Sequence, residues 1–207
     1  GTAYKCKKCG HLQYVYYSCG KGDCCICQYK KSVEWVANLQ TKLFKCPYVH
    51  LITTMPHQLN SLARKYPKII YGILFKSTKL TVFEVCNNPR YLEAKPGLVS
   101  VLHTFGSDIK YHVHLHSLLT FGGIDANNEW VYPKSKHKLC PHRVFRDRFR
   151  GLFLKLLDEE IASKQIKPNA VQAKAIEELR TKAWSYRAQP PTTNTQTIEL
   201  YLSRYIK

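Results

Sequence analysis

The sequence predicts an α+β fold, in which helices pack on an antiparallel sheet and a small cysteine-rich module precedes the sheet. The first observation is a pair of strong strand patterns, 98–105 and 109–121, joined by Gly106-Ser107-Asp108 as in a β-hairpin. The second is that long helical patterns occur without strict alternation with strands, which favours an antiparallel arrangement. The third is the gathering of cysteines in the first thirty residues.

The remaining elements follow from hydrophobic periodicity and from Gly and Pro positions. Residues 1–30 contain several glycines and are predicted to be loop-like. Helices are predicted at 31–45, at 58–87 with an interruption at Pro67, at 142–165 and at 169–187. Strands are predicted at 48–54 and 129–132. A linker containing Pro190-Pro191 is predicted at 188–195, followed by a last helix from about residue 195.

Length and composition indicate one ordinary domain with a small module attached. The chain has 207 residues, and 44% of them are hydrophobic, which supports a packed core and excludes disorder. We therefore expect a zinc-binding module with its linking helix at 1–45 and a larger domain at 46–207. Because the sequence ends within the last predicted helix, we also expect a further C-terminal region.

The charge balance is strongly basic. Lys and Arg number 32 against 14 Asp and Glu, which gives a net charge of +18. Such a chain favours a polyanionic partner, with nucleic acid as the first candidate and an anionic membrane surface as the second. No apolar run approaches the roughly 20 residues that span a bilayer, and no signal-peptide core is present. We expect a soluble cytoplasmic protein that binds nucleic acid and not membranes.

Six of the nine cysteines lie between Cys6 and Cys27. Two Cys-x2-Cys pairs, Cys6 with Cys9 and Cys24 with Cys27, are separated by fourteen residues, close to zinc-ribbon spacing. Four thiolates satisfy tetrahedral Zn²⁺ and leave no open position, so the site is predicted to be structural. An odd cysteine count argues against a disulfide framework. Three further residues compete for one of the four ligand positions: Cys19, Cys25 and His11.

Three histidines alternate in one predicted strand: His112, His114 and His116. Alternate side chains share one face of a sheet, and imidazoles on one face can bind a divalent metal that orients a phosphate. We predict His114 and His116 as the central pair. His103, on the preceding strand of the hairpin, and His112 compete as the third ligand. The alternative is a histidine cluster without metal.

The last helical pattern places Tyr201 and Tyr205 one turn apart on one face, roughly 6 Å from each other. Buried core tyrosines are the simpler interpretation of this spacing. The alternative is a pair of nucleophiles, which need metal or a base because the pKa of tyrosine is near 10. Arg204 is then positioned to stabilise phosphate charge.

Together these motifs resemble the insertion-sequence ninety-one family of rolling-circle transposases. His114-Leu115-His116 is similar to the HUH motif of its endonucleases, and Tyr201-Leu202-Ser203-Arg204-Tyr205 is similar to the Y-x3-Y motif of the two-tyrosine type. The order of zinc knuckles, Leu102–Gly106, HUH and Y-x3-Y also resembles the family, as do Ser18–Gln28 and Met55–Leu59. Val113 and Cys25 depart from the pattern, since the family often has proline there.

The resemblance implies a palm-like antiparallel sheet and a nuclease that uses Mg²⁺ or Mn²⁺ on His103, His114 and His116. It implies that a tyrosine attacks single-stranded DNA and keeps the 5′ end as phosphotyrosine, while the free 3′-OH rejoins a strand. The implied partners are transposon ends and target DNA, in the nucleoid of a prokaryotic cell. No small-molecule substrate is expected, and oligomeric state is not predicted.

Basic residues at the start of helix 142–165 are candidates for holding the DNA strand, since basic grooves with aromatic surfaces bind single strands. The candidates are Arg143, Arg146, Arg148 and Arg150, with a solvated helix face as the alternative. Two other functions compete with the transposase. One is a plasmid replication initiator or relaxase of the same chemistry. The other is a zinc-containing DNA-binding regulator, in which the His and Tyr residues are structural.

Overall fold

The computed structural model describes residues 1–194 except 16, 18, 20–23, 107 and 109. The described residues form two compact units that divide between Leu43 and Phe44. This division lies two residues before the predicted domain boundary. Each unit is described separately below.

The first unit contains a small hairpin and one helix. Strands β1 (Thr2–Lys5) and β2 (Leu12–Val15) pair antiparallel, and α1 spans Cys25–Gln40. The prediction of loop throughout 1–30 is therefore wrong. All residues of both strands are exposed, so no apolar alternation marks them in the sequence. Local backbone bonds close the turn instead, with Gly10 in the left-handed region (φ 71°) donating to the Cys6 carbonyl.

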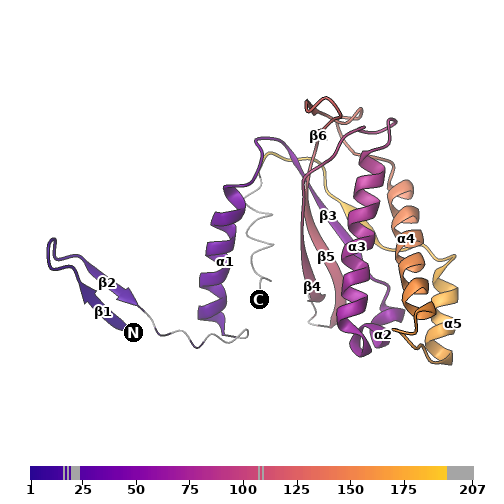
Figure 1. Ribbon diagram of the computed structural model, residues 1–207, viewed down its shortest axis with the longest axis horizontal. Helices are drawn as coiled ribbons and strands as arrows, with labels where there is room; N and C mark the ends of the chain where they lie inside the picture. Colours follow the sequence, from indigo (N-terminus) through magenta and orange to yellow (C-terminus); the bar gives the residue numbers. More distant parts are fainter. Residues whose placement is uncertain (16, 18, 20–23, 107, 109, 195–207) are drawn as a thin grey trace. The chain divides into compact units, whose positions relative to one another are not determined.

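The second unit is built on a four-stranded antiparallel sheet with strand order β4-β5-β3-β8 (Figure 1). The strands are β3 (Tyr48–Thr54), β4 (Leu98–Phe105), β5 (Tyr111–Thr120) and β8 (Tyr186–Ala188). The predicted strands 48–54 and 98–105 and the hairpin of β4 with β5 are confirmed. The α+β fold class with an antiparallel sheet is confirmed as well.

The edge strand β8 corrects two predictions. Helix α5 (Ala170–Leu179) ends well before residue 187, and the predicted linker begins inside a strand. Leu51 of β3 lies opposite Ala188, and the Tyr186 ring stacks on Phe145 at 4.4 Å between centroids. Three residues are too few to show strand periodicity, so only pairing with β3 defines this strand.

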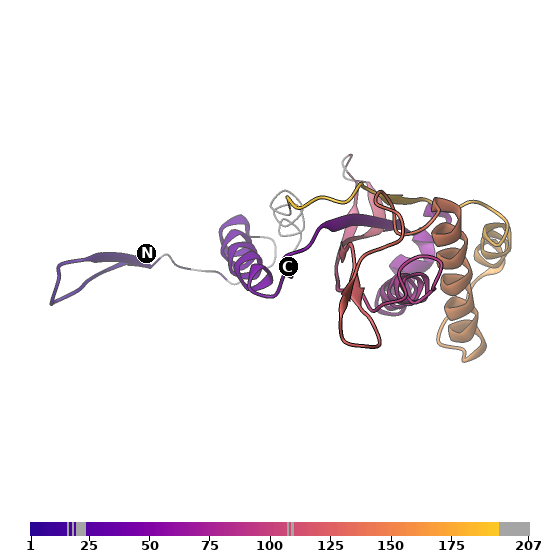
Figure 2. The ribbon, with the colours of Figure 1, turned by 90° about the horizontal axis from the view of Figure 1, so that it is seen from above.

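Helices cover one face of this sheet (Figures 1 and 2). They are η1 (His57–Leu59), α2 (Asn60–Lys65) and α3 (Pro67–Cys86), with α4 (His142–Ala162) packed on α3. The predicted interruption at Pro67 is confirmed: α2 ends before Tyr66, and Pro67 begins α3, because proline fits the first helical turn. The Thr53 hydroxyl of β3 hydrogen-bonds the Thr78 hydroxyl of α3 at 2.9 Å.

The core lies between this face of the sheet and the helices. It includes Val49 and Leu51 of β3, alternate residues of β5, and apolar side chains of α3 and α4. Phe149, Phe153 and Trp184 form a buried edge-to-face aromatic group within it. A separate small hairpin pairs β6 (Gly123–Ile124) with β7 (Trp130–Val131), and β7 lies within the predicted strand 129–132.

No helix within the described part of the chain is both long and apolar enough to cross a membrane.

Replacing Leu115 with Ala tests the core. Leu115 lies on β5, faces the helices and is fully buried, so its truncation leaves a cavity. We expect the free energy of unfolding to fall by about 2–5 kcal/mol. Urea denaturation followed by tryptophan fluorescence measures this change, since Trp184 is buried in the same core.

The matched control is Val171→Ala, because Val171 is 77% exposed. Its effect is expected within about 0.5 kcal/mol. Equal effects of the two substitutions would contradict the assignment of Leu115 to the core.

Candidate functional site

The register of the sheet places three histidines side by side on the face opposite to the helices. Val113 and Leu115 of β5 belong to the core, so His114 and His116, which alternate with them, project from the other face. His103 of β4 lies directly opposite His114 in the ladder. The hairpin therefore brings His103 next to His114. From the sequence, this contact could be inferred only from the distance between the two residues along the chain.

The imidazoles of His103, His114 and His116 form a compact buried triad. One ring nitrogen of each lies within 4.8 Å of those of the other two. The ring centroids of His103 and His116 are 4.2 Å apart, and those of His114 and His116 are 4.8 Å apart. His112, the competing third ligand, is exposed and is not among these three. The geometry favours His103 as the third member.

Burial keeps these imidazoles neutral. Desolvation, with smaller contributions from neighbouring histidines, lowers the pKa of His103 to about 3 and that of His116 to about 2. Desolvation also lowers the pKa of His114. Because a metal binds the neutral form of imidazole, the triad is ready to act as a ligand at neutral pH.

Three neutral nitrogen donors from one sheet face fit a divalent metal ion. Such a set fills one side of the coordination sphere and leaves the other positions for oxygen ligands such as phosphate or water. The Nδ1 atom of His114 lies 2.8 Å from the carbonyl oxygen of His112, so this nitrogen donates and Nε2 is the atom available to a metal. The residues of the triad therefore fit the implied metal.

A fourth histidine, His50 of β3, was missed by the sequence analysis. Its Nε2 lies 2.8 Å from Nδ1 of His116, and the two rings stack at 5.0 Å between centroids. Desolvation lowers the pKa of His50, a hydrogen bond to the Gln189 side chain acts in the opposite direction, and the charge of Arg187 lowers the pKa further. The available signal was a histidine at an alternating position of a predicted apolar strand.

Arg187 is a second residue that the sequence analysis did not single out. It pairs with Ile52 in the ladder between β8 and β3, and Ile52 lies opposite His116 on the other side of β3. Residues paired in a ladder project from the same face, so exposed Arg187 shares the face of the histidine triad. The position of Arg187 on this face follows only from the pairing of residues 186–188 with β3.

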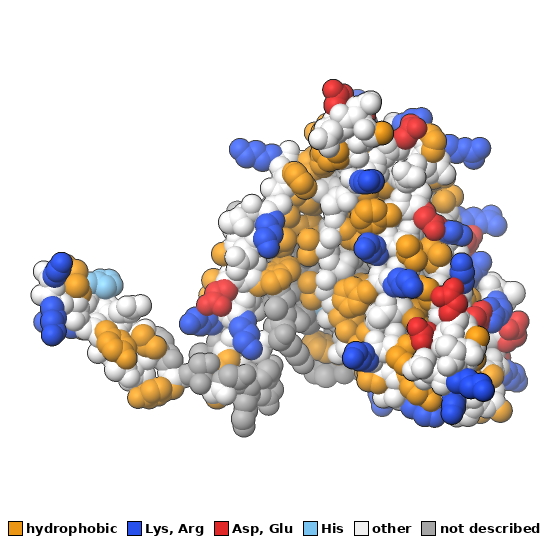
Figure 3. Space-filling view, in the orientation of Figure 1, with side chains coloured by type: hydrophobic (Ala, Val, Ile, Leu, Met, Phe, Trp, Pro, Cys, Tyr) orange, Lys and Arg blue, Asp and Glu red, His pale blue; other side chains and the backbone are white. Residues whose placement is uncertain are grey.

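The predicted DNA-binding arginines lie elsewhere. Arg143, Arg146 and Arg150 project from α4, on the helical side of the sheet, and all three form ion pairs with Asp147 at 3.4, 3.1 and 3.7 Å. Arg148 pairs with Glu84 of α3. Figure 3 shows Lys and Arg side chains interspersed with acidic ones over these helices. This arrangement resembles the solvated helix face that was the alternative interpretation.

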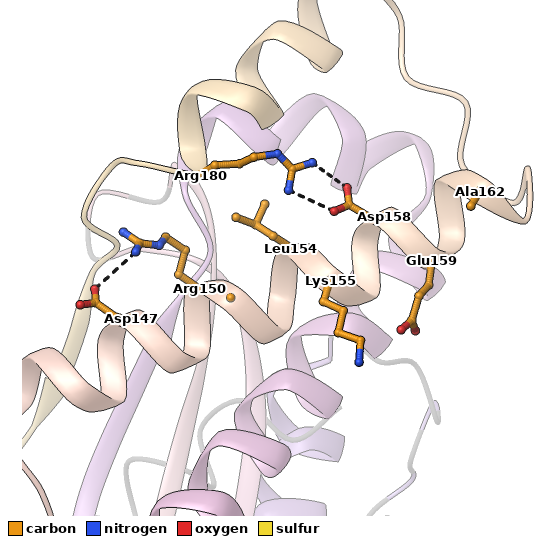
Figure 4. A pocket seen from close by; sticks show the side chains of 9 residues that line it. Asp147, Arg150, Leu154, Lys155, Asp158, Glu159, Ala162 and Arg180 are labelled. Atoms are coloured by element: carbon orange, nitrogen blue, oxygen red, sulfur yellow. Dashed lines mark hydrogen bonds and ion pairs between the residues drawn. The ribbon is translucent and has the colours of Figure 1, made fainter.

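A hollow between α4 and α5 is lined by charges of both signs (Figure 4). Arg180, after the last residue of α5, holds both carboxylate oxygens of Asp158 at 2.9 and 3.0 Å, and Arg150 pairs with Asp147 at the other end. Two of its acids, Asp147 and Asp158, are thus engaged by arginines of the same hollow. Nothing in this lining provides a nucleophile or metal-ligand set, so the chemistry is assigned to the histidine face.

The cysteine module gathers Cys19, Cys24 and Cys27, whose sulfur atoms lie within 4.8 Å of one another. The sulfurs of Cys19 and Cys27 are 3.6 Å apart. Cys6 and Cys9 are exposed in the turn between β1 and β2, where backbone amides of Cys9 and Lys8 lower the pKa of the Cys6 thiol. Cys24 and Cys27 are therefore supported by both spacing and geometry, and Cys19 joins them as the sequence analysis allowed.

The predicted nucleophiles Tyr201 and Tyr205, and with them Arg204, lie outside the described residues.

Comparison with protein families matches two parts of the chain. The family model described as "Transposase zinc-binding domain" matches residues 1–55, and the model described as "Putative transposase" matches residues 97–207. The first match covers the cysteine module, and the second covers β4 and β5 with the histidine triad and continues through the Y-x3-Y segment. Zn²⁺ at the cysteine module is supported by the first match together with the gathered thiols.

Individual proteins extend the same similarity. "Putative transposase y4qJ" of Sinorhizobium fredii is 29% identical over 216 residues, covering 99% of this chain and 54% of its own length. The transposase for insertion sequence element IS801 of Pseudomonas savastanoi pv. phaseolicola is 26% identical over 205 residues, covering 96% and 48%. The chain thus spans about half the length of the curated relatives it matches.

Among solved structures, the conjugative relaxase TrwC in complex with oriT DNA, a metal-free structure, aligns with a TM-score of 0.42 at 9% identity. The alignment covers 74% of this chain and 70% of that one.

The histidine triad predicts a pH-dependent stability in the absence of added divalent metal. The folded-state pKa values of His103 and His116 lie below the ordinary value of 6.5, so the unfolded chain binds more protons in acid. This stabilisation is complete above about pH 6.5 and is lost as pH falls toward the folded-state values. We expect the free energy of unfolding to decrease steadily from pH 6.5 to 4.5.

The measurement compares wild type with His103→Leu in urea titrations across this range. The variant is expected to show a shallower dependence, by at most about one proton. Subtracting the two curves leaves the contribution of His103 and of its interactions with neighbouring histidines, because all other groups contribute equally to both. Parallel curves would show that His103 is not held neutral by burial.

Proposed function

Because the chain belongs to the insertion-sequence ninety-one family of transposases, we propose that it nicks and rejoins single-stranded DNA at a metal ion on His103, His114 and His116. The buried triad supports this function, since its three neutral imidazoles converge on one face of the sheet. A site of this kind needs to hold a scissile phosphate and to present a nucleophile to it.

The triad, Arg187 and the two tyrosines each have a role in the proposed reaction. Mg²⁺ or Mn²⁺ bound to the triad supplies a Lewis acid for the scissile phosphate. Arg187, exposed on the same face, is positioned to stabilise phosphate charge. The phenolic oxygen of Tyr201 or Tyr205 forms a bond to phosphorus, and the bond from phosphorus to the 3′ oxygen breaks.

The products of this step explain why no high-energy cofactor is required. The attacking phenol gives up its proton and the departing 3′ oxygen takes one up to become a 3′-OH, while the 5′ end stays on the enzyme as a phosphotyrosine. Attack of a 3′-OH on that phosphotyrosine restores a phosphodiester and frees the tyrosine. The proposed partners are single-stranded transposon ends and target DNA in a prokaryotic nucleoid, consistent with the net charge of +18.

The zinc module is proposed to have a structural role beside this reaction. A complete thiolate set leaves Zn²⁺ no position for substrate, and the exposed hairpin of the module has no core to stabilise it. Cys24 and Cys27 are the central ligands of this proposal. The other two come from Cys6, Cys9 and Cys19.

Single Cys→Ser substitutions test the zinc ligands. Cys24→Ser and Cys27→Ser are expected to reduce bound zinc from about one ion per chain to nearly none after gel filtration, as measured by atomic emission. Cys46→Ser is the control, because Cys46 belongs to the other unit. This variant is expected to retain its zinc. Comparing Cys6→Ser with Cys19→Ser then identifies the remaining ligands. Full zinc content in Cys24→Ser would contradict the proposal.

The nucleophiles are tested by trapping the covalent intermediate. Labelled single-stranded DNA carrying the element's ends is incubated with the protein and Mn²⁺ or Mg²⁺, then separated on a denaturing gel. We expect a covalent protein–DNA band that requires the metal and disappears in the Tyr201→Phe, Tyr205→Phe double variant.

Tyr132→Phe is the matched control for this experiment, because Tyr132 is exposed on the surface beside β7 and is expected to leave the band intact. A band that persists in the double variant would contradict the assignment of the nucleophile. Tight binding of single-stranded DNA by the wild type without any band would favour the non-catalytic regulator.

A further inference from the structure

We propose that His50 is a positioning residue, which holds the His116 ring so that its Nε2 faces the metal position. This inference rests on the proposed function of the triad as a metal site. Polar side chains cross the whole sheet in one row, from His103 on β4 through His114 and His116 on β5 to His50 on β3 and Gln189 after β8. Only the first three belong to the triad.

The contact between His50 and His116 is buried and well formed. His50 is 7% exposed and His116 is 3% exposed, and their ring nitrogens are 2.8 Å apart. The rings are nearly parallel, with an interplanar angle of 28°. A hydrogen bond of this length between two buried rings fixes the rotation of both, because its loss leaves a buried polar group unsatisfied.

The direction of this hydrogen bond follows from the other partner of His50. The Gln189 backbone amide donates to the His50 carbonyl at 3.0 Å, which places the two residues side by side. Nε2 of His50 faces His116, so the hydrogen bond to the Gln189 side chain uses Nδ1. When the Gln189 amide oxygen accepts from Nδ1–H of His50, Nε2 of His50 must accept from Nδ1–H of His116. The lone pair of His116 Nε2 is then available to a metal.

His114 provides an internal comparison. Its Nδ1–H donates to the His112 carbonyl, which leaves Nε2 available in the same way. Both β5 histidines therefore hold the proton on Nδ1, one through the backbone and the other through a side chain. Only the anchor of His116 can be removed by substitution, and removal of such a partner typically lowers metal affinity about 10–100-fold.

The test measures the proton position and the metal affinity of the 207-residue chain loaded with zinc. Long-range ¹H–¹⁵N NMR correlations of the protein without added Mn²⁺ identify the tautomer of His116, and titration with Mn²⁺, followed by the electron paramagnetic resonance of the free ion, gives the affinity. We expect His116 to carry its proton on Nδ1. His50→Leu is expected to lower Mn²⁺ affinity about 10–100-fold, and His50→Gln, whose amide oxygen can accept the same bond, is expected to restore most of it.

Two further variants separate positioning from folding. Gln189→Ala removes the outer partner at an exposed strand edge, without a change in the core, and is expected to weaken Mn²⁺ binding less than His50→Leu. His137→Leu removes an exposed histidine outside the row and is expected to bind Mn²⁺ like the wild type. Thermal unfolding of each variant shows whether the fold is retained.

The proposal is overturned if His116 carries its proton on Nε2, or if folded His50→Leu binds Mn²⁺ as tightly as wild type. It is also overturned if His50→Leu and His50→Gln both lose Mn²⁺ binding as completely as His116→Ala, since His50 would then be a ligand. Neither readout involves DNA cleavage. A protein that shows the expected tautomer and affinities but forms no covalent DNA product would contradict the proposed function alone.

Discussion

The register between β5 and its two neighbours, β3 and β4, is the constraint on which the site depends. Side chains alternate between the faces of a sheet, so a shift of one residue would turn His114 and His116 toward the helices and Leu115 away from them. The helices prevent this shift, because the core on their side accepts only the apolar set of β5. Packing of Leu115 and its neighbours therefore fixes the position of the histidines on the opposite face.

Burial determines the chemistry of the histidine face. A solvated imidazole titrates near pH 6.5, but the low pKa values of His103 and His116 keep both rings neutral throughout the physiological range. Neutral rings need hydrogen-bond partners, and the strands place the His112 carbonyl against Nδ1 of His114 and Nε2 of His50 against Nδ1 of His116. The same strands thus arrange the donors, remove competing protons and orient the rings.

The arginines of the chain lie in two different electrostatic environments. On α4, arginines surround Asp147 or pair with Glu84, so part of their charge is compensated within the helical layer. Arg187 lies instead on the face of the triad, at the edge strand next to β3. For the proposed reaction, an exposed cation on the face of the triad would influence a bound phosphate more than paired cations on the far side of the sheet.

Local pattern was sufficient for much of this protein. Runs of β-favouring residues located β3 and β4, and period-two alternation placed His114 and His116 on one face, because these signals depend on nearby residues alone. The Cys-x2-Cys spacing identified the zinc module for the same reason. Tertiary structure decided what depends on pairing between distant segments. β8 is a strand only because β3 hydrogen-bonds it, and His50 meets His116 only because β3 and β5 pair across 66 residues. Such contacts have no local periodicity, so the sequence indicated which residues could bind a metal, and the folded sheet determined which histidine supports them.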